Sequence, residues 1–331
     1  MHEVWIVAET LEGKIKEVSF ELLGRARALS DTLGVKLGSV VLGYQVGQSE
    51  LQRLIAHGSD VVYAVDDSRL ASFGCERYAN ALGHLIAMHQ PQIVIAGATT
   101  MGRTLMPYVA VKAHAGLTAD CTDLTIEEST GNLLQTRPAI GGNIMATIRT
   151  ADHRPQMATV RPHSMRPLVP DPGRKGTIEH VSFAPEWDDR RVEVLGIRKI
   201  DDQKHSIEEA EIVVSGGRGL KKRDNFSLIQ QLARDLGAQV GASRDAVDRG
   251  WASYPHQVGL SGKTISPRLY VAVGISGAVQ HLAGIKTAEC IVAINSDERA
   301  NLLDIADFAI VGDLFAILPE IERRLEQRSR S

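Results

Sequence analysis

The chain has 331 residues, of which 44% are hydrophobic and 23% charged, and its formal net charge is -3. This length suffices for two domains, and the composition is that of ordinary globular proteins rather than of disordered or fibrous chains. The small negative charge offers no basic field for nucleic acid, and no apolar run approaches the roughly 20 residues that span a bilayer.

The start of the chain and its cysteines bear on location and on bound metals. MHEVWIVAET leads directly into a β-like run, without a basic or apolar leader or an Arg/Ser-rich presequence, so we expect a cytoplasmic protein without membrane insertion. Cys75, Cys121 and Cys290 lie far apart and form no C-x-x-C pair. We expect buried thiols rather than a disulfide framework, a zinc site or an iron–sulfur cluster.

The first part of the chain alternates between short apolar runs and segments with helical periodicity. The helical periodicity is clearest in Val18–Leu33 and Glu76–Met88. Apolar runs that alternate with helices predict a parallel sheet covered on both faces. The runs that we expect to be strands are Val4–Ala8, Leu37–Leu42, Val61–Val65 and Ile93–Ala96.

Past Gly116 the pattern changes to short runs joined by tight turns. We expect these runs to form an antiparallel extension of the same domain. The next stretch, Pro167–Glu186, contains four prolines and two glycines and is expected to be irregular. The expected strands of the extension are Thr122–Glu127, Leu133–Pro138, Asn143–Arg149 and Gln156–Arg161.

A polar segment, Asp201–Lys204, is a plausible hinge between two domains. We place the boundary near residue 200, which divides the chain into residues 1–200 and 201–331. Apolar runs again alternate with helical segments after this point, so the second domain is also expected to hold a parallel sheet. Its expected strands are Glu211–Ser215, Gln239–Gly241, Leu269–Val273, Cys290–Ile294 and Phe308–Val311.

Three of the turns after these strands are rich in glycine or polar residues. The segment 216–219, Gly-Gly-Arg-Gly, can approach a ligand closely and direct Arg218 towards it, although a tight turn with a solvated arginine is an equal alternative. The segments 274–277 and 295–297 follow two further strands. Such turns at the carboxyl ends of parallel strands are where open α/β sheets bind nucleotides.

Four sequence blocks in this domain carry a resemblance to the electron transfer flavoprotein α subunit. They are VVSGGRGL, GASRDAVDRGW, HQVGLSGK and VAVGISGAVQHLAG, and the last is followed by CIVAIN and DFAIVGDLF. The resemblance implies an α/β protein of two domains. Residues 1–200 would form a doubly wound parallel sheet with an antiparallel extension that packs against a β subunit, and residues 201–331 a Rossmann-like domain that binds FAD.

The resemblance also implies contacts with the flavin half of FAD. Arg218 would contact a phosphate or the ring edge. Ser243 and Arg244 would lie against the pyrophosphate and the isoalloxazine, and Gln257–Ser261 would line the ring.

Further contacts are implied with the remainder of FAD. Ser276–His281 would cover the phosphate and pyrimidine regions, and Asn295 and Asp313 would hold the adenosine half. For Asp313, which precedes a helix, a cap of that helix is an equal alternative. The FAD-binding residues implied in this way are Arg218, Ser243, Arg244, Gln257, Val258, Gly259, Leu260, Ser261, Gly274, Ser276, Gly277, Ala278, Val279, Gln280, His281, Asn295 and Asp313.

Two of these residues suit the adjustment of the reduction potential of the flavin. Reduced flavins carry negative charge near N1 and O2, so a cation or a hydrogen-bond donor there favours reduction. Arg244 and His281 fit this role, and His281 could act through a positive charge or through a neutral N–H. The Ser261 hydroxyl could donate to flavin N5. The chain has Leu260-Ser261 where the commonest sequence of the family has Gln-Thr. The hydroxyl is kept, but the residue before it is apolar instead of polar.

The resemblance implies an electron-carrying subunit rather than a stand-alone catalyst. It would pair with a β subunit that holds AMP or a second FAD. Electrons would arrive from an acyl-CoA dehydrogenase, another dehydrogenase or NADH and leave to a quinone-linked oxidoreductase or another acceptor. Simple shuttling and electron bifurcation both stay open, as do two alternatives of another class, a non-redox nucleotide-binding regulator and an NAD-dependent enzyme.

Overall fold

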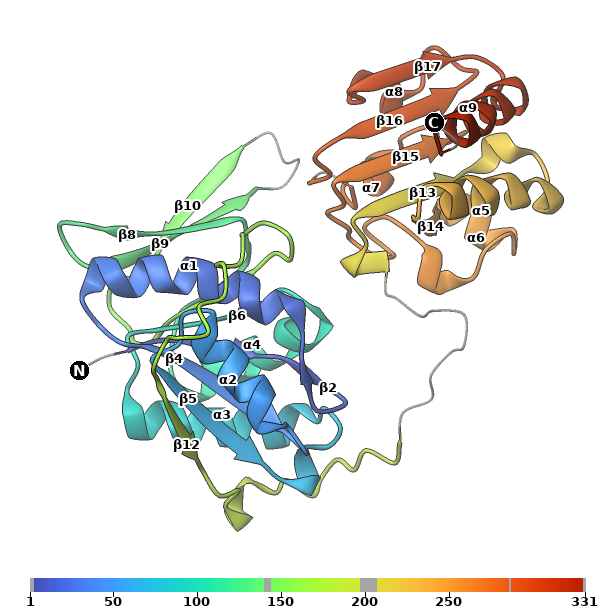
Figure 1. The fold of residues 1–331 in the computed structure, drawn as a ribbon. Helices are drawn as coiled ribbons and strands as arrows, with labels where there is room; N and C mark the ends of the chain where they lie inside the picture. The colour runs from blue at the N-terminus through green and yellow to red at the C-terminus, as the bar shows by residue number, and fades with distance from the viewer. Residues whose placement is uncertain (1–2, 140–143, 197–206, 286, 330–331) are drawn as a thin grey trace. The chain divides into compact units, whose positions relative to one another are not determined.

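The chain divides into two compact units, residues 1–199 (the N-terminal unit) and residues 200–331 (the C-terminal unit) (Figure 1). The structure is a computed structural model that describes residues 3–139, 144–196, 207–285 and 287–329. The boundary expected near residue 200 and the hinge expected at Asp201–Lys204 lie outside the described residues.

The N-terminal unit is built on a seven-stranded sheet in which every strand pair is parallel. The strand order is β12-β5-β4-β1-β6-β11-β7, so the chain starts near the centre and extends the sheet in both directions. This order confirms the doubly wound parallel sheet that the sequence predicts. The strands are β1 (Val4–Ala8), β4 (Leu37–Gly43), β5 (Val61–Asp66), β6 (Ile93–Gly97), β7 (Leu117–Cys121), β11 (Gln156–Val160) and β12 (Thr177–His180).

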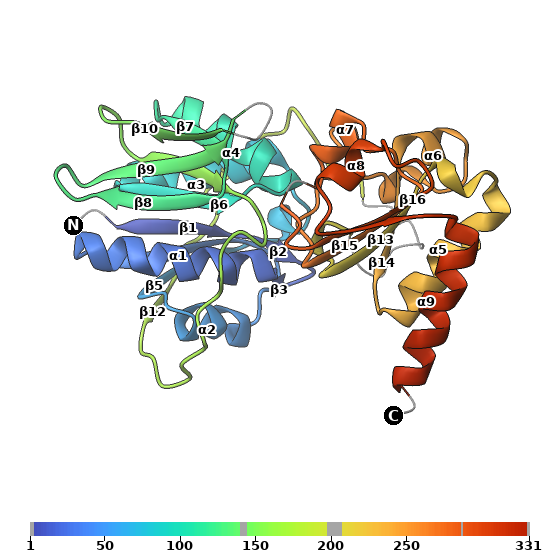
Figure 2. The ribbon, with the colours of Figure 1, turned by 90° about the horizontal axis from the view of Figure 1, so that it is seen from above.

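Helices cover both faces of this sheet, as Figure 2 shows. Successive side chains of a strand point to opposite faces, and β1 follows this rule. Ile6 packs with α1 and α2, whereas Trp5 and Val7 pack with α3 and α4. Because both faces are covered, all five residues of β1 are buried. The helices are α1 (Glu17–Leu33), α2 (Gln48–Ala56), α3 (Cys75–His89) and α4 (Thr100–Lys112).

A three-stranded antiparallel sheet, ordered β10-β9-β8, extends the same unit. It confirms the expected antiparallel extension for three of the four runs past Gly116. The expectation is wrong for Gln156–Arg161, because β11 lies in the parallel sheet between β6 and β7. Every residue of β11 is buried, as a central strand of such a sheet requires. The antiparallel strands are β8 (Asp123–Glu127), β9 (Asn132–Pro138) and β10 (Met145–Arg149).

The proline-rich stretch is more regular than the sequence predicts. Within it, Thr177–His180 forms β12, which pairs with β5 at the edge of the large sheet. The prolines flank this strand, so they do not remove any of its backbone donors. Pro185–Trp187 then forms the 3-10 turn η2, and the buried Trp187 packs with α3.

The C-terminal unit holds five parallel strands in the order β14-β13-β15-β16-β17. The chain changes direction across this sheet between β13 and β15, which is the point where open α/β sheets bind ligands. All five strands expected here are present, each within one residue of its expected bounds. They are β13 (Ile212–Gly216), β14 (Gln239–Ala242), β15 (Leu269–Val273), β16 (Ile291–Asn295) and β17 (Phe308–Val311).

Helices also lie on both faces of this second sheet, with α5 and α9 on one face and α7 and α8 on the other (Figure 2). These helices are α5 (Phe226–Asp235), α6 (Arg244–Asp248), α7 (Val279–Leu282), α8 (Asn301–Asp304) and α9 (Leu314–Ser329). The remaining short elements are β2 (Thr10–Leu11), β3 (Lys14–Ile15), η1 (Ser68–Leu70), η3 (Ile207–Glu209), η4 (Arg218–Leu220), η5 (Arg223–Asn225) and η6 (Tyr254–His256).

The described residues contain no helix that is both long enough and apolar enough to cross a membrane. In the same part of the chain, no group of three or more His, Cys, Asp or Glu side chains could hold a metal ion. The three cysteines are free thiols, of which Cys121 is buried and Cys75 and Cys290 are half-buried. Burial raises the pKa of the Cys121 thiol to about 12, so this thiol is inert at neutral pH.

Two turns meet backbone to backbone at the direction change between β13 and β15. Gly217 N donates to the Val273 carbonyl and Gly219 N donates to the Gly274 carbonyl, both at 2.9 Å. Gly274 has φ 61°, and a Cβ atom there would lie 2.8 Å from the Cα of Gly219. A side chain at Gly274 would therefore push the two turns apart.

We expect Gly274→Ala to destabilise the C-terminal unit more than a positive φ alone explains. Gly237→Ala is the matched control, because Gly237 has φ 63° and nothing lies within 4 Å of a Cβ built there. The control should cost about 1 kcal/mol of unfolding free energy and Gly274→Ala about 3 kcal/mol. Urea unfolding, with hydrogen exchange to assign the transition to residues 207–329, measures both losses. Equal losses would show that the two turns are not tightly packed.

Candidate functional site

A cavity of about 560 Å³ lies in the C-terminal unit at the carboxyl ends of β13, β15 and β16. Its size falls within the range of small-molecule and cofactor pockets, roughly 300 to 1,000 Å³. Most of the residues that the sequence predicts for a cofactor site contribute to its wall. They are Arg218, Ser243, Arg244, Val258, Gly259, Ser261, Gly274, Ser276, Ala278, Gln280, His281 and Asn295.

Gln257 and Leu260 belong to the predicted set but do not line this cavity. The buried Gln257 side chain instead supports the loop, since its Nε2 donates to the Ser261 carbonyl at 3.0 Å and to the Ser261 Oγ at 3.1 Å. Tyr254 Oη donates to the same carbonyl at 3.1 Å. The Leu260 side chain is 72% exposed. These hydrogen bonds fix the conformation of residues 257–261. The Ser261 hydroxyl accepts in them and keeps its own proton for donation.

Gly277, Val279 and Asp313 also lie outside the wall of the cavity. Gly277 faces the start of α8, where a Cβ would come within 2.4 Å of the Leu302 N, and the Val279 side chain is 69% exposed. Asp313 precedes α9, and its Oδ1 accepts a hydrogen bond from Phe315 N at 3.0 Å. The structure therefore gives Asp313 the helix-capping role that the sequence left as an alternative.

The cavity wall carries two exposed arginines. Arg218 begins η4 and forms no salt bridge with any described residue. Arg244 begins α6, and its Nε lies 3.4 Å from the Asp248 Oδ2, with the two side chains 71% and 62% exposed. An exposed pair of this kind contributes at most about 1 kcal/mol, so a phosphate could displace Asp248 at little cost. Both arginines are available to an anionic ligand.

Two polar residues of the wall also shape the turns around the cavity. Ser243 caps α6, since its Oγ accepts from Ala246 N at 3.4 Å, and its hydroxyl proton is free to donate. Asn295 joins the turns after β15 and β16, because its Nδ2 donates to the Ile275 carbonyl at 2.9 Å and its Oδ1 accepts from Asp297 N at 3.0 Å. The turns are therefore fixed in place without a ligand.

His281 is the buried polar residue of the wall, with 7% of its surface exposed. Its Nε2 lies 2.8 Å from the Tyr270 Oη, and its Nδ1 has no hydrogen-bond partner among the described residues. Burial lowers the pKa of His281 to about 4, and the Val258 backbone carbonyl opposes this shift only in part. In the chain without a ligand, burial therefore favours a neutral His281 over a positively charged one.

Sequence reasoning missed several residues of the cavity wall. Each one lies in the same turn or short helix as a predicted residue, and this proximity in sequence could have identified it as part of the site. Tyr270, which contacts His281 from the strand β15, carried no such signal. Gly219, Ile275 and Asp297 lie in turns that the sequence analysis expected to bind a nucleotide, although they were not named as contacts, and Asp245 and Asp248 were missed.

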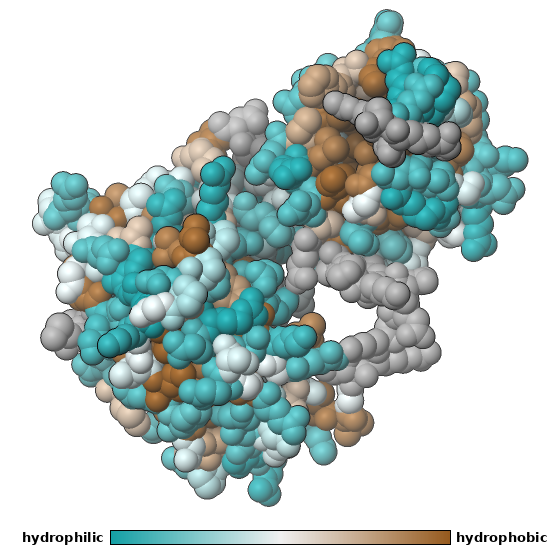
Figure 3. Space-filling model, viewed as in Figure 1, coloured by the Kyte–Doolittle hydropathy of each residue, from teal (hydrophilic) through white to brown (hydrophobic). Residues whose placement is uncertain are grey.

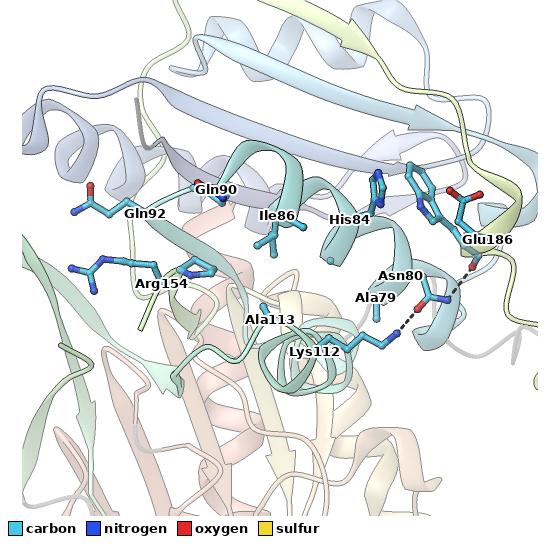
Figure 4. A pocket seen from close by; sticks show the side chains of 15 residues that line it. Ala79, Asn80, His84, Ile86, Gln90, Gln92, Lys112, Ala113, Arg154 and Glu186 are labelled. Carbon is cyan, nitrogen blue, oxygen red and sulfur yellow. Dashed lines mark hydrogen bonds between the residues drawn. The ribbon is translucent and has the colours of Figure 1, made fainter. Parts of the chain in front are cut away.

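A larger cavity, of about 900 Å³, lies in the N-terminal unit beside α3, α4 and η2. At one end Lys112 Nζ donates to the Asn80 Oδ1 at 2.5 Å, and Asn80 Nδ2 donates to the Trp187 carbonyl at 3.2 Å. Gln92 and Arg154 lie at the other end (Figure 4). None of the predicted site residues lines this cavity, and it lies away from the carboxyl ends of the strands, where α/β sheets bind nucleotides.

Comparisons with known proteins match both units. The electron transfer flavoprotein domain matches residues 4–186, and the electron transfer flavoprotein FAD-binding domain matches residues 206–286. The chain is 46% identical over 325 residues to the electron transfer flavoprotein subunit alpha of Thermoanaerobacterium thermosaccharolyticum, with 98% of each chain covered. It is 44% identical over 318 residues to protein FixB of Clostridium saccharobutylicum, covering 96% of this chain and 94% of that protein. It is 41% identical over 327 residues to the electron transfer flavoprotein subunit alpha of Megasphaera elsdenii, with 98% and 96% covered.

We expect His281 to stay neutral well below the pH at which an exposed histidine protonates. Folding lowers its pKa from 6.5 to about 4, so between these values the unfolded chain binds a proton that the folded chain does not. The free energy of unfolding should therefore decrease as the pH is lowered from 6.5 to 4, by up to about 1.4 kcal/mol per pH unit, and His281 should add no pH dependence above this window. Nitrogen-15 NMR titration of the histidines measures the pKa directly.

His281→Gln is the control, since it removes this part of the pH dependence and its missing resonance identifies His281. A His281 resonance that titrates near pH 6.5 would contradict the buried, neutral side chain.

Proposed function

The chain belongs to the electron transfer flavoprotein α-subunit family, and we propose that it holds FAD in the cavity at the carboxyl ends of β13, β15 and β16. As a member it is an electron-transfer flavoprotein subunit with a flavin cofactor and a β-subunit partner. The proposal concerns the identity of the flavin, the residues that hold it and the proteins with which electrons are exchanged.

The observation that carries the proposal is the gathering of the predicted residues around one cavity of the C-terminal unit. They come from turns that are far apart in sequence, and the carboxyl ends of parallel strands bring them to one edge of the sheet. The cavity also fits the chemistry of FAD. Arg218 and Arg244 suit its phosphates, and the buried, uncharged His281 suits the flavin ring.

Each side chain of the wall has a distinct role in this proposal. Arg218, Arg244 and the Ser243 hydroxyl bind the phosphates, because charge-assisted hydrogen bonds to phosphate are strong and directional. Ser261 and His281 lie against the flavin ring from two neighbouring segments, which are joined by the hydrogen bond from Leu260 N to the Gln280 carbonyl. Bound FAD supplies the redox chemistry, and the protein supplies its position and electrostatic surroundings. Asp313 caps α9 through its Oδ1, which does not exclude the contact with the adenosine half that the resemblance implies, so this contact stays part of the proposal.

The N-terminal unit is proposed to pack against the β subunit. Apolar side chains reach the surface of the molecule (Figure 3). On and beside β10 these include the exposed Ile144, Met145 and Ile148. Exposed apolar groups along the outer strand of a sheet favour contact with another chain.

The proposed electron donor is an acyl-CoA dehydrogenase, another dehydrogenase or NADH, and the proposed acceptor is a quinone-linked oxidoreductase or a similar protein. The β subunit would hold AMP in a simple electron carrier and a second FAD in a bifurcating complex. Relatives named electron transfer flavoprotein subunit alpha and relatives named FixB match the chain at similar identity, 46% and 44%. We propose simple carriage, with bifurcation as the alternative.

We expect the chain to need its β subunit in order to retain FAD. Co-expression with the β subunit should give a yellow heterodimer that releases FAD on denaturation, whereas the chain expressed alone should be poor in FAD or poorly soluble. The visible spectrum and the released flavin measure this directly. A colourless heterodimer would contradict the proposal and favour a non-redox nucleotide-binding regulator, and a stable, FAD-saturated monomer would contradict the need for a partner.

We expect Arg218→Ala to weaken FAD binding in the heterodimer. It removes a charge-assisted contact worth roughly 1.5 to 3 kcal/mol, so FAD should dissociate about 10- to 100-fold more readily. Arg234→Ala is the matched control, because Arg234 is an exposed arginine of α5 in the same unit and does not line the cavity. Fluorescence of released FAD after dilution measures both. Equal release from the two variants would remove Arg218 from the site.

A further inference from the structure

Three arginines surround one carboxylate at the carboxyl edge of the N-terminal parallel sheet. Asp120 lies near the end of β7, and its carboxylate accepts hydrogen bonds from Arg161 Nε at 3.1 Å and from Arg161 Nη2 at 2.5 Å. Arg103 of α4 approaches the same carboxylate, with its Nη2 3.5 Å from the Asp120 Oδ1. Burial opposes ionisation, but Arg161, Arg103 and Arg137 of β9 together lower the pKa of Asp120. These three arginines are called the arginine cluster below.

The strand pattern places Arg137 beside Asp120. Two residues before Arg137, the buried Gln135 accepts a hydrogen bond from Thr118 of β7, and its Nε2 donates to the Met157 carbonyl at 3.4 Å. Side chains two positions apart in a strand point to the same face, so Arg137 follows Gln135 along β9 as Asp120 follows Thr118 along β7. Arg137 forms no hydrogen bond or salt bridge with any described residue.

The arginine cluster carries more positive charge than its carboxylate neutralises. Three guanidinium groups and one carboxylate leave an excess of two positive charges. The Arg161 side chain is 12% exposed and binds both oxygens of Asp120, whereas the Arg103 side chain is 48% exposed. An exposed pair at 3.5 Å is weak, so Arg103 and Arg137 are available to a second carboxylate.

The backbone of β7 is shaped to hold Asp120 in this position. Between two of the positions at which β7 pairs with β11, β7 contains one residue more than β11, which makes a β-bulge at Asp120. Asp120 has φ 61°, and its N donates to the Thr159 Oγ1 at 2.9 Å. Bulges redirect side chains, and a positive φ costs free energy at any residue except glycine. Backbone strain that is supported in this way is typical of functional positions.

The arginine cluster adjoins the apolar strand that is proposed to meet the β subunit. β10 is the outer strand of the three-stranded sheet, and its Ala146 lies opposite Arg137 of β9. The exposed Met145 precedes Ala146. The exposed Ile148 pairs with Gln135 and therefore shares the face of Arg137. An apolar surface with arginines beside it is typical of contacts between proteins.

We propose that Arg103 and Arg137 are a docking site for a carboxylate side chain of the β subunit, and that Asp120 and Arg161 hold this site in place. The inference rests on the proposed packing of the N-terminal unit against the β subunit. No arginine of the cluster lines either of the two cavities described above, so a contact on the surface suits a protein carboxylate better than an enclosed small anion. Such a charged contact fixes the orientation of the partner on the apolar strand.

The direct test is Arg137→Lys in the heterodimer, treated with a water-soluble carbodiimide that joins an amine to a carboxylate in contact with it. Mass spectrometry should show a link between position 137 and an Asp or Glu of the β subunit. Arg149→Lys is the matched control, because Arg149 lies on β10 and its Nη1 is 2.9 Å from the Glu127 Oε2 of the same chain. The control should link to Glu127 instead.

The affinity of the two subunits gives a second measurement. Arg137→Gln should raise the dissociation constant of the heterodimer about 10-fold, as expected for the loss of one charge-assisted hydrogen bond, and should weaken its dependence on salt. Arg149→Gln loses an ion pair within its own chain and should change the dissociation constant less than about twofold. Sedimentation velocity at decreasing protein concentration measures both.

The outcomes separate this inference from the FAD site. A link from position 137 to Asp120 alone would overturn the inference, as would an unchanged dissociation constant in a folded Arg137→Gln heterodimer. Protection of position 137 by inorganic phosphate, without any link to the β subunit, would assign the arginine cluster to a free anion and would also overturn it. If Arg137→Gln does not fold, the carbodiimide link in Arg137→Lys, which keeps the charge, still decides. A wild-type heterodimer without FAD would overturn the FAD site and leave this inference standing.

Discussion

The candidate site depends on the close approach of two backbone turns where the C-terminal sheet changes direction. The amide of Gly219 donates to the carbonyl of Gly274, and no side chain separates these two glycines. Because the carboxyl ends of parallel strands share one edge of the sheet, the turns after β14 and β16 bring Arg244 and Asn295 to the same cavity. The glycine contact and the parallel strand order together create a binding surface from distant segments.

The cavity combines an exposed charged part with a buried neutral part. Arg244 is largely exposed, so water and Asp248 screen its charge, and its contribution is greatest towards a phosphate that it contacts directly. His281 is buried in a region of low local dielectric constant, and burial favours its uncharged form. In the proposed function, binding of the cofactor and adjustment of its electronic properties therefore fall to different residues.

The sequence predicted the two sheets and the turns of the site well, because apolar runs and glycine-rich turns are local signals. It could not predict which way a loop side chain faces. Gln257 lies in the predicted loop, but its side chain hydrogen-bonds to Ser261 within that loop and does not line the cavity. The placement of Gln156–Arg161 depends on two strands far away in sequence. The neutral state of His281 and its contact with Tyr270 arise only from burial in the folded unit.

The most direct test of this account is hydrogen–deuterium exchange of the heterodimer without FAD, before and after FAD is added. The account predicts that exchange slows in the segments that form the cavity of the C-terminal unit, which are residues 217–220, 243–248, 258–261 and 274–281. The larger cavity beside α3 and α4 should show no such change. Protection confined to the N-terminal unit, or unchanged exchange in the four C-terminal segments, would contradict the assignment of FAD to this site.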